Sequence, residues 1–199
     1  MPLSEVLDRV RHAGPPRPSP FEPPAGVHRS AVLVPLFEED DDTWVVLTRR
    51  SQHLRAHKGE VAFPGGRQDE GEALTDTARR EALEEIGLDP ATVEIVGELD
   101  HLATVSSGSS IVPYVAVLPG RPEVHVASPD EVEAVLMVAF GELLADGVHR
   151  TELWPWPPGT EAERPMHFFD LVGDTVWGAT ARMLANLLEI ALGVDDRRA

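Results

Sequence analysis

Residues 66–88 have the sequence GRQDEGEALTDTARREALEEIGL, and this stretch decides the fold. Its second part, residues 73–86, is predicted to be a helix, because small and apolar residues recur along one stripe at helical spacing. The stripe consists of Thr75, Ala82, Leu83 and Ile86. Gly87 follows at the position where many helices end in the left-handed conformation.

Three carboxylates lie close together on this predicted helix. At about 100° per residue, Glu81 and Glu85 are about 40° apart, and Glu84 lies about 60° to the other side of Glu81. Oxygen ligands select hard cations, so Mg²⁺ or Mn²⁺ is the expected occupant, with substrate phosphates as further ligands. On this spacing alone, a charged and solvated helix face is the alternative.

The charges around the helix are segregated along the chain. Residues 49–67 contain five basic residues and a single acidic one, Glu60, whereas residues 69–85 contain seven acidic and two basic residues. A basic block beside an acidic block can hold a phosphate on one side and its divalent cation on the other. Two neighbouring solvated faces would give the same counts.

Composition restricts the class of protein. The chain has 199 residues, enough for one well-buried domain, and its formal net charge of −17 argues against a nucleic-acid partner. No apolar run approaches the length of a membrane span, and charges among the first twenty residues argue against a secretory signal. Without cysteine there are no disulfides, thiolate zinc sites or cysteine nucleophiles. We therefore expect a cytoplasmic protein without a membrane partner.

The remaining patterns predict an α+β fold, in which helices cover a sheet within one domain. Strands are expected at 30–37, 43–48, 61–63, 93–102, 111–118, 133–138 and 167–171, further helices at 3–12, 141–145 and 180–191, and a loop at 154–159. Residues 1–29 are interpreted as a helix and a proline-rich arm, 30–192 as the main domain and 193–199 as a tail.

The stretch 66–88 resembles the Nudix box. Gly66, Glu72 and the run Arg80-Glu81-Ala82-Leu83-Glu84-Glu85-Ile86-Gly87-Leu88 occupy its fixed positions with its spacing. Ala82 is the one small residue where that pattern has a bulky apolar one. The resemblance implies a metal-dependent hydrolase of nucleoside diphosphates linked to another moiety. It also implies an α/β/α sandwich with a mixed sheet, in which the box forms a loop, a helix and a second loop.

Residues upstream of the box are similar to the extra signature of the coenzyme A branch of this family. The similarity runs through Leu47-Thr48-Arg49-Arg50-Ser51, Arg55, Gly59 and Phe63-Pro64-Gly65-Gly66, with Val46 as the only departure. Trp177-Gly178-Ala179-Thr180-Ala181 is also similar to that branch. The resemblance implies hydrolysis of coenzyme A, and of acyl-coenzyme A, to 3′,5′-ADP and 4′-phosphopantetheine or its acyl form.

This resemblance assigns expected roles to residues. Glu81, Glu84 and Glu85 would bind Mg²⁺ or Mn²⁺, and Arg80 would orient these glutamates. The general base would be Glu84, Glu98 or Glu131. Substrate phosphates would be bound by the residues Arg49, Arg50, Arg55, Lys58, Gly65 and Gly66.

Several alternatives stay open at this stage. The substrate could instead be ADP-ribose, NADH or a dinucleoside polyphosphate, or the chain could be a silent nucleotide-binding module, although its intact glutamates oppose that. His53 and His57 have the spacing of a zinc pair but lack a third ligand, which favours phosphate contact or a surface role. Trp154 and Trp156 would stack on adenine, line an acyl channel or pack internally. The protein is expected to be a monomer or a homodimer.

Overall fold

The computed structural model describes residues 1–19, 27–104, 108–155, 163–195 and 197. The elements in chain order are α1 (Leu3–Arg11), β1 (His28–Glu39), β2 (Asp42–Arg50), β3 (Val61–Ala62), β4 (Gly65–Arg67), α2 (Leu74–Ile86), the short 3₁₀ helix η1 (Pro90–Thr92), β5 (Glu94–Glu98), β6 (Leu102–Thr104), β7 (Ser109–Val117), β8 (Val132–Ala139), α3 (Phe140–Leu143), β9 (His149–Pro155), β10 (Glu163–Leu171), β11 (Asp174–Trp177) and α4 (Gly178–Leu192).

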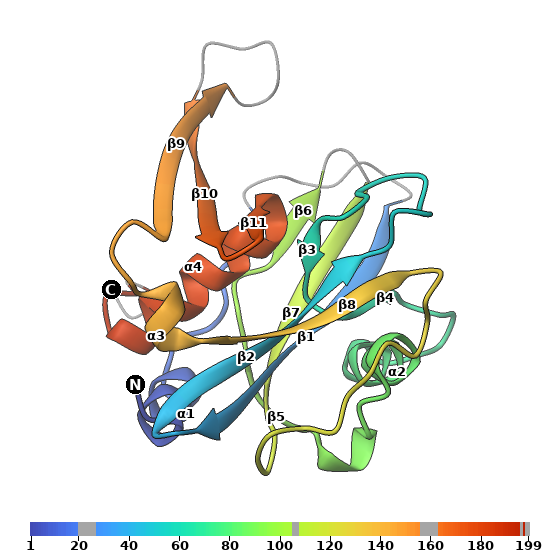
Figure 1. Ribbon diagram of the computed structural model, residues 1–199, viewed down its shortest axis with the longest axis horizontal. Coiled ribbons are helices and arrows are strands. Elements are labelled where there is room, and N and C mark those ends of the chain that lie inside the picture. Colours follow the sequence, from blue (N-terminus) through green and yellow to red (C-terminus); the bar gives the residue numbers. More distant parts are fainter. Residues whose placement is uncertain (20–26, 105–107, 156–162, 196, 198–199) are drawn as a thin grey trace.

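The central sheet is mixed, as expected. Its main path runs β3-β2-β1-β7-β5, and β4, β6 and β8 pair with β1, β7 and β2 respectively. β1 is parallel to β7 and antiparallel to β2 (Figure 1). The β1–β2 hairpin closes through Asp40 and Asp41, both of which have positive φ, as a two-residue turn that fits the strand twist requires.

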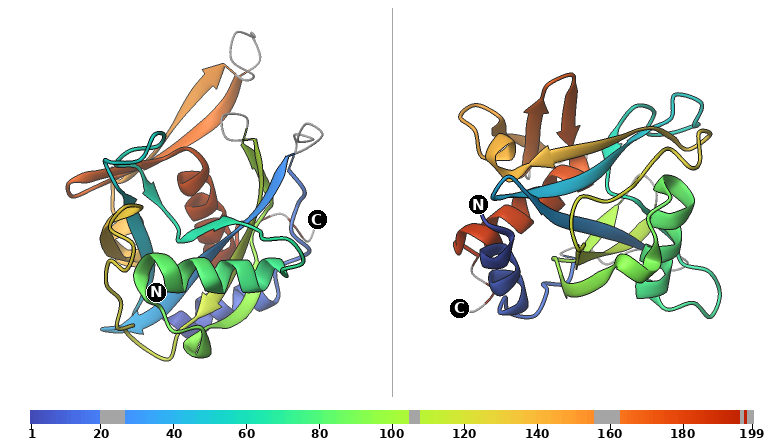
Figure 2. Two further views of the ribbon diagram at one scale, coloured as in Figure 1. Left: turned by 90° about the vertical axis from the view of Figure 1, so that its right-hand side faces the viewer. Right: turned by 60° about the horizontal axis from the view of Figure 1, so that its bottom comes forward.

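Helices cover both faces of this sheet, which confirms the α/β/α sandwich within one domain (Figure 2). β1 is apolar on both faces because each face meets a helix layer. Val32, Val34 and Leu36 pack in the cluster that includes α1 and α4, whereas Ala31 and Leu33 pack in the cluster that includes α2. The box helix α2 therefore has one face of the sheet as its support.

The predicted box helix is confirmed at nearly the expected residues. α2 spans Leu74–Ile86, and Gly87 ends it with φ of 68° in the left-handed region. Ala78, Ala82 and Ile86 of α2 are buried against the sheet, whereas Leu83, which was predicted to lie on this stripe, is 45% exposed. The small Ala82 of the box thus occupies a fully buried position on this helix.

A second sheet, of three strands in the order β11-β10-β9, was not anticipated (Figure 1). The prediction of a loop from residue 154 was wrong for Trp154 and Pro155, which end β9. All seven residues of β9 are exposed, so the strand lacks the apolar and polar alternation that reveals a half-buried strand. β11 lies beside β3 of the central sheet.

The strand expected at 93–102 is two strands, β5 and β6, separated near Asp100. Asp100 is buried, and its backbone N–H donates to Asn186 Oδ1 of α4 at 2.9 Å. Asp100 Oδ1 accepts the backbone N–H of Arg17 at 2.9 Å. This bond holds the first part of the proline-rich segment against the domain. Residues 20–26 of that segment lie outside the described residues.

Candidate active site

Arg80 of α2 holds the loop before the helix and the glutamates on it. Its Nε and Nη2 donate to the two carboxylate oxygens of Glu72, at 2.9 and 3.1 Å. Its Nη1 donates to Glu81 Oε1 at 2.9 Å and to Glu84 Oε2 at 3.2 Å, and Nη2 also donates to the carbonyl of Arg67. One guanidinium therefore ties the loop to the helix and binds two of the three box glutamates.

Glu72 is the anchor of this arrangement. Hydrogen bonds from Arg80, and then from the Thr77 hydroxyl, lower the pKa of Glu72 to about 2. The Thr77 Oγ1 to Glu72 Oε2 distance is 2.6 Å, and the backbone N–H of Asp69 donates to the same oxygen. Glu72 is thus ionised and holds the loop in place, and both of its carboxylate oxygens already accept hydrogen bonds.

Glu81 and Glu85 form the buried part of the site. The side chain of Glu81 is 14% exposed and the whole residue Glu85 is 3% exposed. Burial raises the pKa of Glu81, and it raises the pKa of Glu85 to about 8, with smaller contributions from the charges of Glu81 and Glu131. The backbone N–H of Gly65 donates to Glu85 Oε2 at 3.2 Å. A buried carboxylate beside like charges favours a nearby cation.

The three candidate bases occupy different surroundings. Glu84 is exposed and paired with Arg80. Glu131 is exposed, and it lies close enough to Glu81 and Glu85 for its charge to raise the pKa of both. Glu98 accepts from His101 Nε2 at 2.9 Å and its charge raises the pKa of Tyr114. The structure therefore brings Glu131 toward the box glutamates, whereas the contacts of Glu98 are elsewhere.

Arg49 and Arg50 face opposite sides of β2. Arg49 donates from Nε and Nη2 to the two carboxylate oxygens of Asp174 in β11, at 2.8 and 2.5 Å. Arg50 lies on the side of α2, where its charge lowers the pKa of Glu85. Its Nε is buried and has no hydrogen-bond partner in the part of the chain that the structure describes. Of the two adjacent arginines, only Arg50 presents an unsatisfied donor beside the box.

Arg55 and Lys58 lie on the exposed loop between β2 and β3 (Figure 1). The loop is tied at its base, since the backbone N–H of Gly59 donates to the carbonyl of Arg50. His57 of the same loop pairs with Glu60 at 3.0 Å, and within the described residues neither His57 nor His53 belongs to a group of three side chains that could hold a metal. Arg55 and Lys58 are therefore accessible to an anion in solution.

Gly65 and Gly66 are required by close approaches of the chain. A Cβ on Gly65 would lie 2.4 Å from the carbonyl oxygen of Ala31, and its φ of 158° also disfavours a side chain. A Cβ on Gly66 would lie 2.5–2.6 Å from the carboxylate atoms of Glu81. Gly66 therefore leaves the space that the Glu81 carboxylate occupies, and Gly65 allows the close approach of β4 to β1.

Comparison with known proteins decides the family of this chain. The model of the NUDIX domain family matches residues 27–158. The chain belongs to the Nudix family. That family is one of hydrolases that act on nucleotide derivatives and generally use divalent metal ions.

Relatives of this Nudix chain have the same family name. It is 42% identical over 168 residues to Nudix hydrolase 22 of Arabidopsis thaliana. The matched region makes up 78% of this chain and 53% of the plant protein. It is 32% identical over 192 residues to the Nudix hydrolase NudL of Yersinia enterocolitica, over 94% of this chain and 92% of that one. The chain thus spans about half the length of the plant relative and nearly all of NudL.

A solved structure supports the fold of the Nudix chain along nearly its whole length. The MutT/nudix family protein from Enterococcus faecalis matches with a TM-score of 0.57 at 18% identity, over 97% of this chain and 70% of that one. At this identity the match establishes a shared fold and carries no information on the substrate.

The Nudix site has the donor chemistry of a divalent-cation site. Glu81 and Glu85 offer buried oxygen ligands that repel each other, and Gly66 leaves the space beside Glu81 open. Within the described ranges, no three His, Cys, Asp or Glu side chains converge into a ready metal-binding group. Arg80 binds one oxygen of Glu81 and one oxygen of Glu84, and the second oxygen of each carboxylate is left for a cation. The residues therefore fit a cation whose coordination is completed by water or by substrate phosphate.

Sequence reasoning missed Asp174, the carboxylate that binds Arg49, because residue 174 lies 125 positions from Arg49 and has no local signal.

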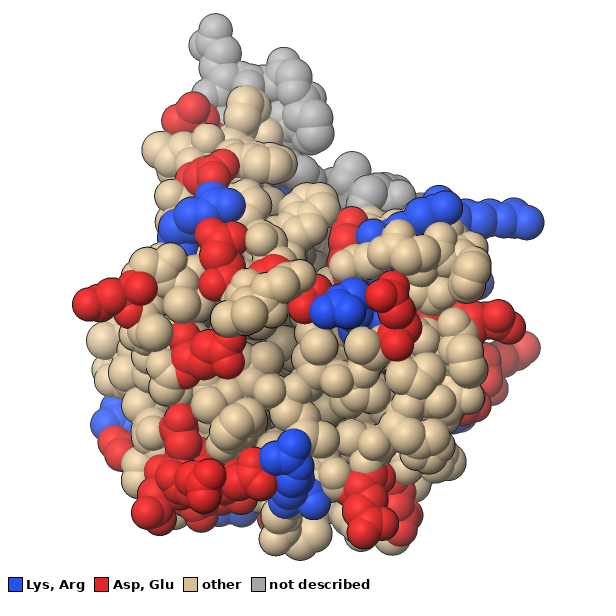
Figure 3. Space-filling model, viewed as in Figure 1, with Lys and Arg blue, Asp and Glu red and all other residues tan. Residues whose placement is uncertain are grey.

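Trp154 is exposed in β9 and packs at an angle on Phe168, and Trp156 lies outside the described residues. No helix in the described ranges has the length and apolar character that a membrane crossing requires. Acidic side chains are spread over the face shown in Figure 3, as the net charge of −17 leads one to expect.

Proposed function

We propose that this Nudix hydrolase cleaves the pyrophosphate bond of coenzyme A, and of acyl-coenzyme A, to 3′,5′-ADP and 4′-phosphopantetheine or its acyl form. The observation that carries the proposal is the position of Arg50. Its buried Nε lacks a partner in the described part of the chain, and its charge reaches Glu85. The residue as a whole is partly exposed, and a guanidinium with no carboxylate partner among the described residues is suited to phosphate oxygens. Arg50 also belongs to the sequence signature that resembles the coenzyme A branch.

The exposed cations of the β2–β3 loop support the same substrate. Coenzyme A has a 3′-phosphate in addition to its pyrophosphate, so it requires more cationic contacts than a simple nucleoside diphosphate. Arg55 and Lys58 are exposed on a loop whose base is fixed next to Arg50. We assign them to substrate phosphates, with Gly65 and Gly66 giving the close approach, whereas Arg49 acts through its bond to Asp174.

The box glutamates supply the reaction centre of this proposal. Glu81, Glu85 and Glu84 would hold Mg²⁺ or Mn²⁺, which neutralises the pyrophosphate and lowers the pKa of the attacking water. Arg80 keeps the glutamates in place through its bonds to Glu72 and Glu81. Glu131 is our choice of general base, because it is exposed near Glu81 and Glu85 while Glu84 is paired with Arg80 and Glu98 with His101.

Product analysis tests the proposal. The protein is incubated with coenzyme A, an acyl-coenzyme A, ADP-ribose and NADH in ¹⁸O-labelled water containing Mg²⁺ or Mn²⁺. We expect 3′,5′-ADP and phosphopantetheine, with the label on one product phosphate, and the highest kcat/KM for coenzyme A or its ester. A higher kcat/KM for ADP-ribose or NADH would overturn the substrate, and no turnover of any compound would indicate a silent module.

A further inference from the structure

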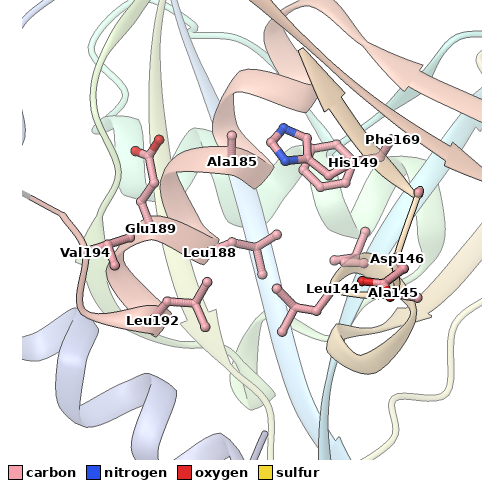
Figure 4. Close-up of a pocket in the computed structure, with 12 residues that line it drawn as sticks. Leu144, Ala145, Asp146, His149, Phe169, Ala185, Leu188, Glu189, Leu192 and Val194 are labelled. Atoms are coloured by element: carbon pink, nitrogen blue, oxygen red, sulfur yellow. The ribbon is translucent and has the colours of Figure 1, made fainter.

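A pocket that contains no residue of the box lies between α3, the first residue of β9, β10 and α4 (Figure 4). Its volume is about 320 Å³. The residues that form it belong to or adjoin the core on the α1 and α4 side of the central sheet, whereas α2 packs on the other side. No residue of the candidate active site contributes to its lining.

The walls of this pocket are mainly apolar. They are formed by Leu143, Leu144, Ala145, Phe169, Ala185, Leu188, Leu192 and Val194. Leu144 and Leu192 are 40% and 46% exposed, and Figure 4 shows their side chains directed toward Leu188. Large aliphatic groups that stay this accessible around a concavity offer a surface that an apolar ligand group would cover.

The charged groups of the lining are both acidic. Asp146 and Glu189 carry carboxylates, and no lysine or arginine belongs to the lining. Asp146 is exposed and has no ion pair within the described part of the chain. Glu189 has one ion pair, with Arg182 Nη1 at the long distance of 3.9 Å. Arg9 of α1, which is paired with Glu5, lies beside Gly193 between the lining residues Leu192 and Val194. The lining itself has two carboxylates and no cation, so its own net charge is negative.

His149 adds no positive charge to this lining. Arg182 Nη1 lies 3.4 Å from His167 Nε2, which must be the acceptor because a guanidinium can only donate. The hydrogen of neutral His167 is then on Nδ1, which donates to His149 Nε2 at 3.0 Å. Burial lowers the pKa of both rings, that of His167 to about 4. His149 is thus a neutral ring stacked on Phe169 at 4.6 Å.

We propose that this pocket binds a small amphipathic cation, an aromatic or aliphatic body that carries a protonated amine. The apolar body would lie against Leu144, Leu188 and the ring of His149, and the ammonium group would lie by Glu189 and Asp146. A pocket of about 320 Å³ is at the lower end of the size range of ligand sites, so the ligand is a small molecule. This site is independent of the proposed reaction.

Three indole compounds that differ in charge test the proposal directly. Tryptamine is cationic, indole is neutral and indole-3-propionate is anionic, while the ring is common to all. Binding is measured by titration calorimetry and by the NMR shifts of the Leu144, Leu188 and Leu192 methyl groups and the His149 ring. We expect saturable binding of tryptamine, about 10-fold or more tighter than that of indole-3-propionate, with shifts at these residues.

Isosteric variants locate the charge. Glu189→Gln and Asp146→Asn should each weaken tryptamine binding about 3- to 10-fold and leave indole binding unchanged. Glu142→Gln is the matched control, because Glu142 is an exposed carboxylate of α3 outside the lining. Equal binding of the three compounds, shifts at other residues, or no saturable binding would overturn the proposal. So would sedimentation showing that a second copy of the chain covers this pocket.

Discussion

Arg49 and Arg50 are consecutive residues of β2 whose guanidinium groups serve opposite faces of the central sheet. Arg49 is bound in a two-point contact to Asp174 of β11, and Arg50 acts on Glu85 of α2. Successive side chains of a strand point to opposite faces, so this separation is a consequence of the strand itself. One arginine thereby connects the two sheets, and the other belongs to the candidate active site.

The Arg49–Asp174 contact is expected to stabilise the protein. Asp174→Asn should lower the free energy of unfolding by about 1–3 kcal/mol, because a partly buried, charge-assisted pair is lost. Denaturant unfolding measures this effect. Asp170→Asn is the control, since its pair with Arg150 is exposed and should contribute much less.

The same pair of arginines separates structure from catalysis. Arg50→Ala should reduce kcat/KM for coenzyme A about 10-fold or more with little loss of stability, whereas Asp174→Asn should mainly lower stability. Equal effects of both variants on kcat/KM would contradict the division of roles between Arg49 and Arg50.

Glu85→Gln should reduce kcat about 100-fold or more while keeping the fold, because an amide is a poorer ligand for a hard cation. Steady-state kinetics at saturating Mg²⁺ measures the effect, and chelation of the metal should abolish activity of the wild-type protein. Glu70→Gln is the control at an exposed carboxylate nearby and should keep its activity. Near wild-type turnover of Glu85→Gln would exclude Glu85 as a metal ligand.

Stability without metal should fall as the pH rises through the titration of Glu85. Its carboxyl group has a pKa of about 8 when folded, against 4.5 as a model value, because the folded protein buries it. Below pH 4.5 it is protonated in both states and stability is fully present. Between pH 4.5 and 8 the unfolded state loses the proton first, so stability declines by up to about 1.4 kcal/mol per pH unit.

Urea unfolding between pH 5 and 9 measures this decline. With a chelator present, wild-type protein should lose stability relative to Glu85→Gln as the pH rises, because the variant has no carboxyl group to ionise. Mg²⁺ should restore stability of the wild type most strongly near pH 8, since the cation binds the ionised form. If the stabilities of the wild type and of Glu85→Gln change with pH in parallel in the chelator, the raised pKa of Glu85 is refuted.

Gly66→Ala should displace the Glu81 carboxylate, because the new Cβ would come within 2.5–2.6 Å of its atoms. Glu81 is the end of a flexible side chain, so we expect little loss of stability but a decrease in kcat/KM of about 10- to 100-fold. Gly120→Ala is the matched control, since a Cβ there meets no atom within 4 Å. Unchanged kinetics of Gly66→Ala would show that the position of Glu81 is not critical.

The 3′-phosphate provides a test of the substrate assignment. Wild-type protein should prefer coenzyme A over dephospho-coenzyme A by about 10- to 100-fold in kcat/KM, the effect of one charge-assisted contact. Arg55→Ala or Lys58→Ala should remove this preference and largely keep activity on dephospho-coenzyme A. If wild type shows no preference, the cations of the loop bind the pyrophosphate, and the substrate is a broader class of nucleoside diphosphates.

The sequence by itself determined the box and its helix. Residues 73–86 contain small and apolar residues at helical spacing, of which Ala82 and Ile86 are buried, and Gly87 ends the helix. Arg80 lies within about one turn of Glu81 and Glu84, which it binds. These features depend on hydrogen bonds and spacing between near neighbours, so they can be read from a short stretch. The β1–β2 hairpin was predictable for the same reason.

Only the tertiary structure decided which distant groups join this helix. The charge of Glu131, in the loop before β8, raises the pKa of Glu81 and of Glu85, and Asp174 of the second sheet binds Arg49. β9 was missed because its exposed residues show no alternation. Contacts between residues far apart in the chain arise from packing of the whole sheet against its helices, and that packing leaves no periodic signal in the residues that it brings together.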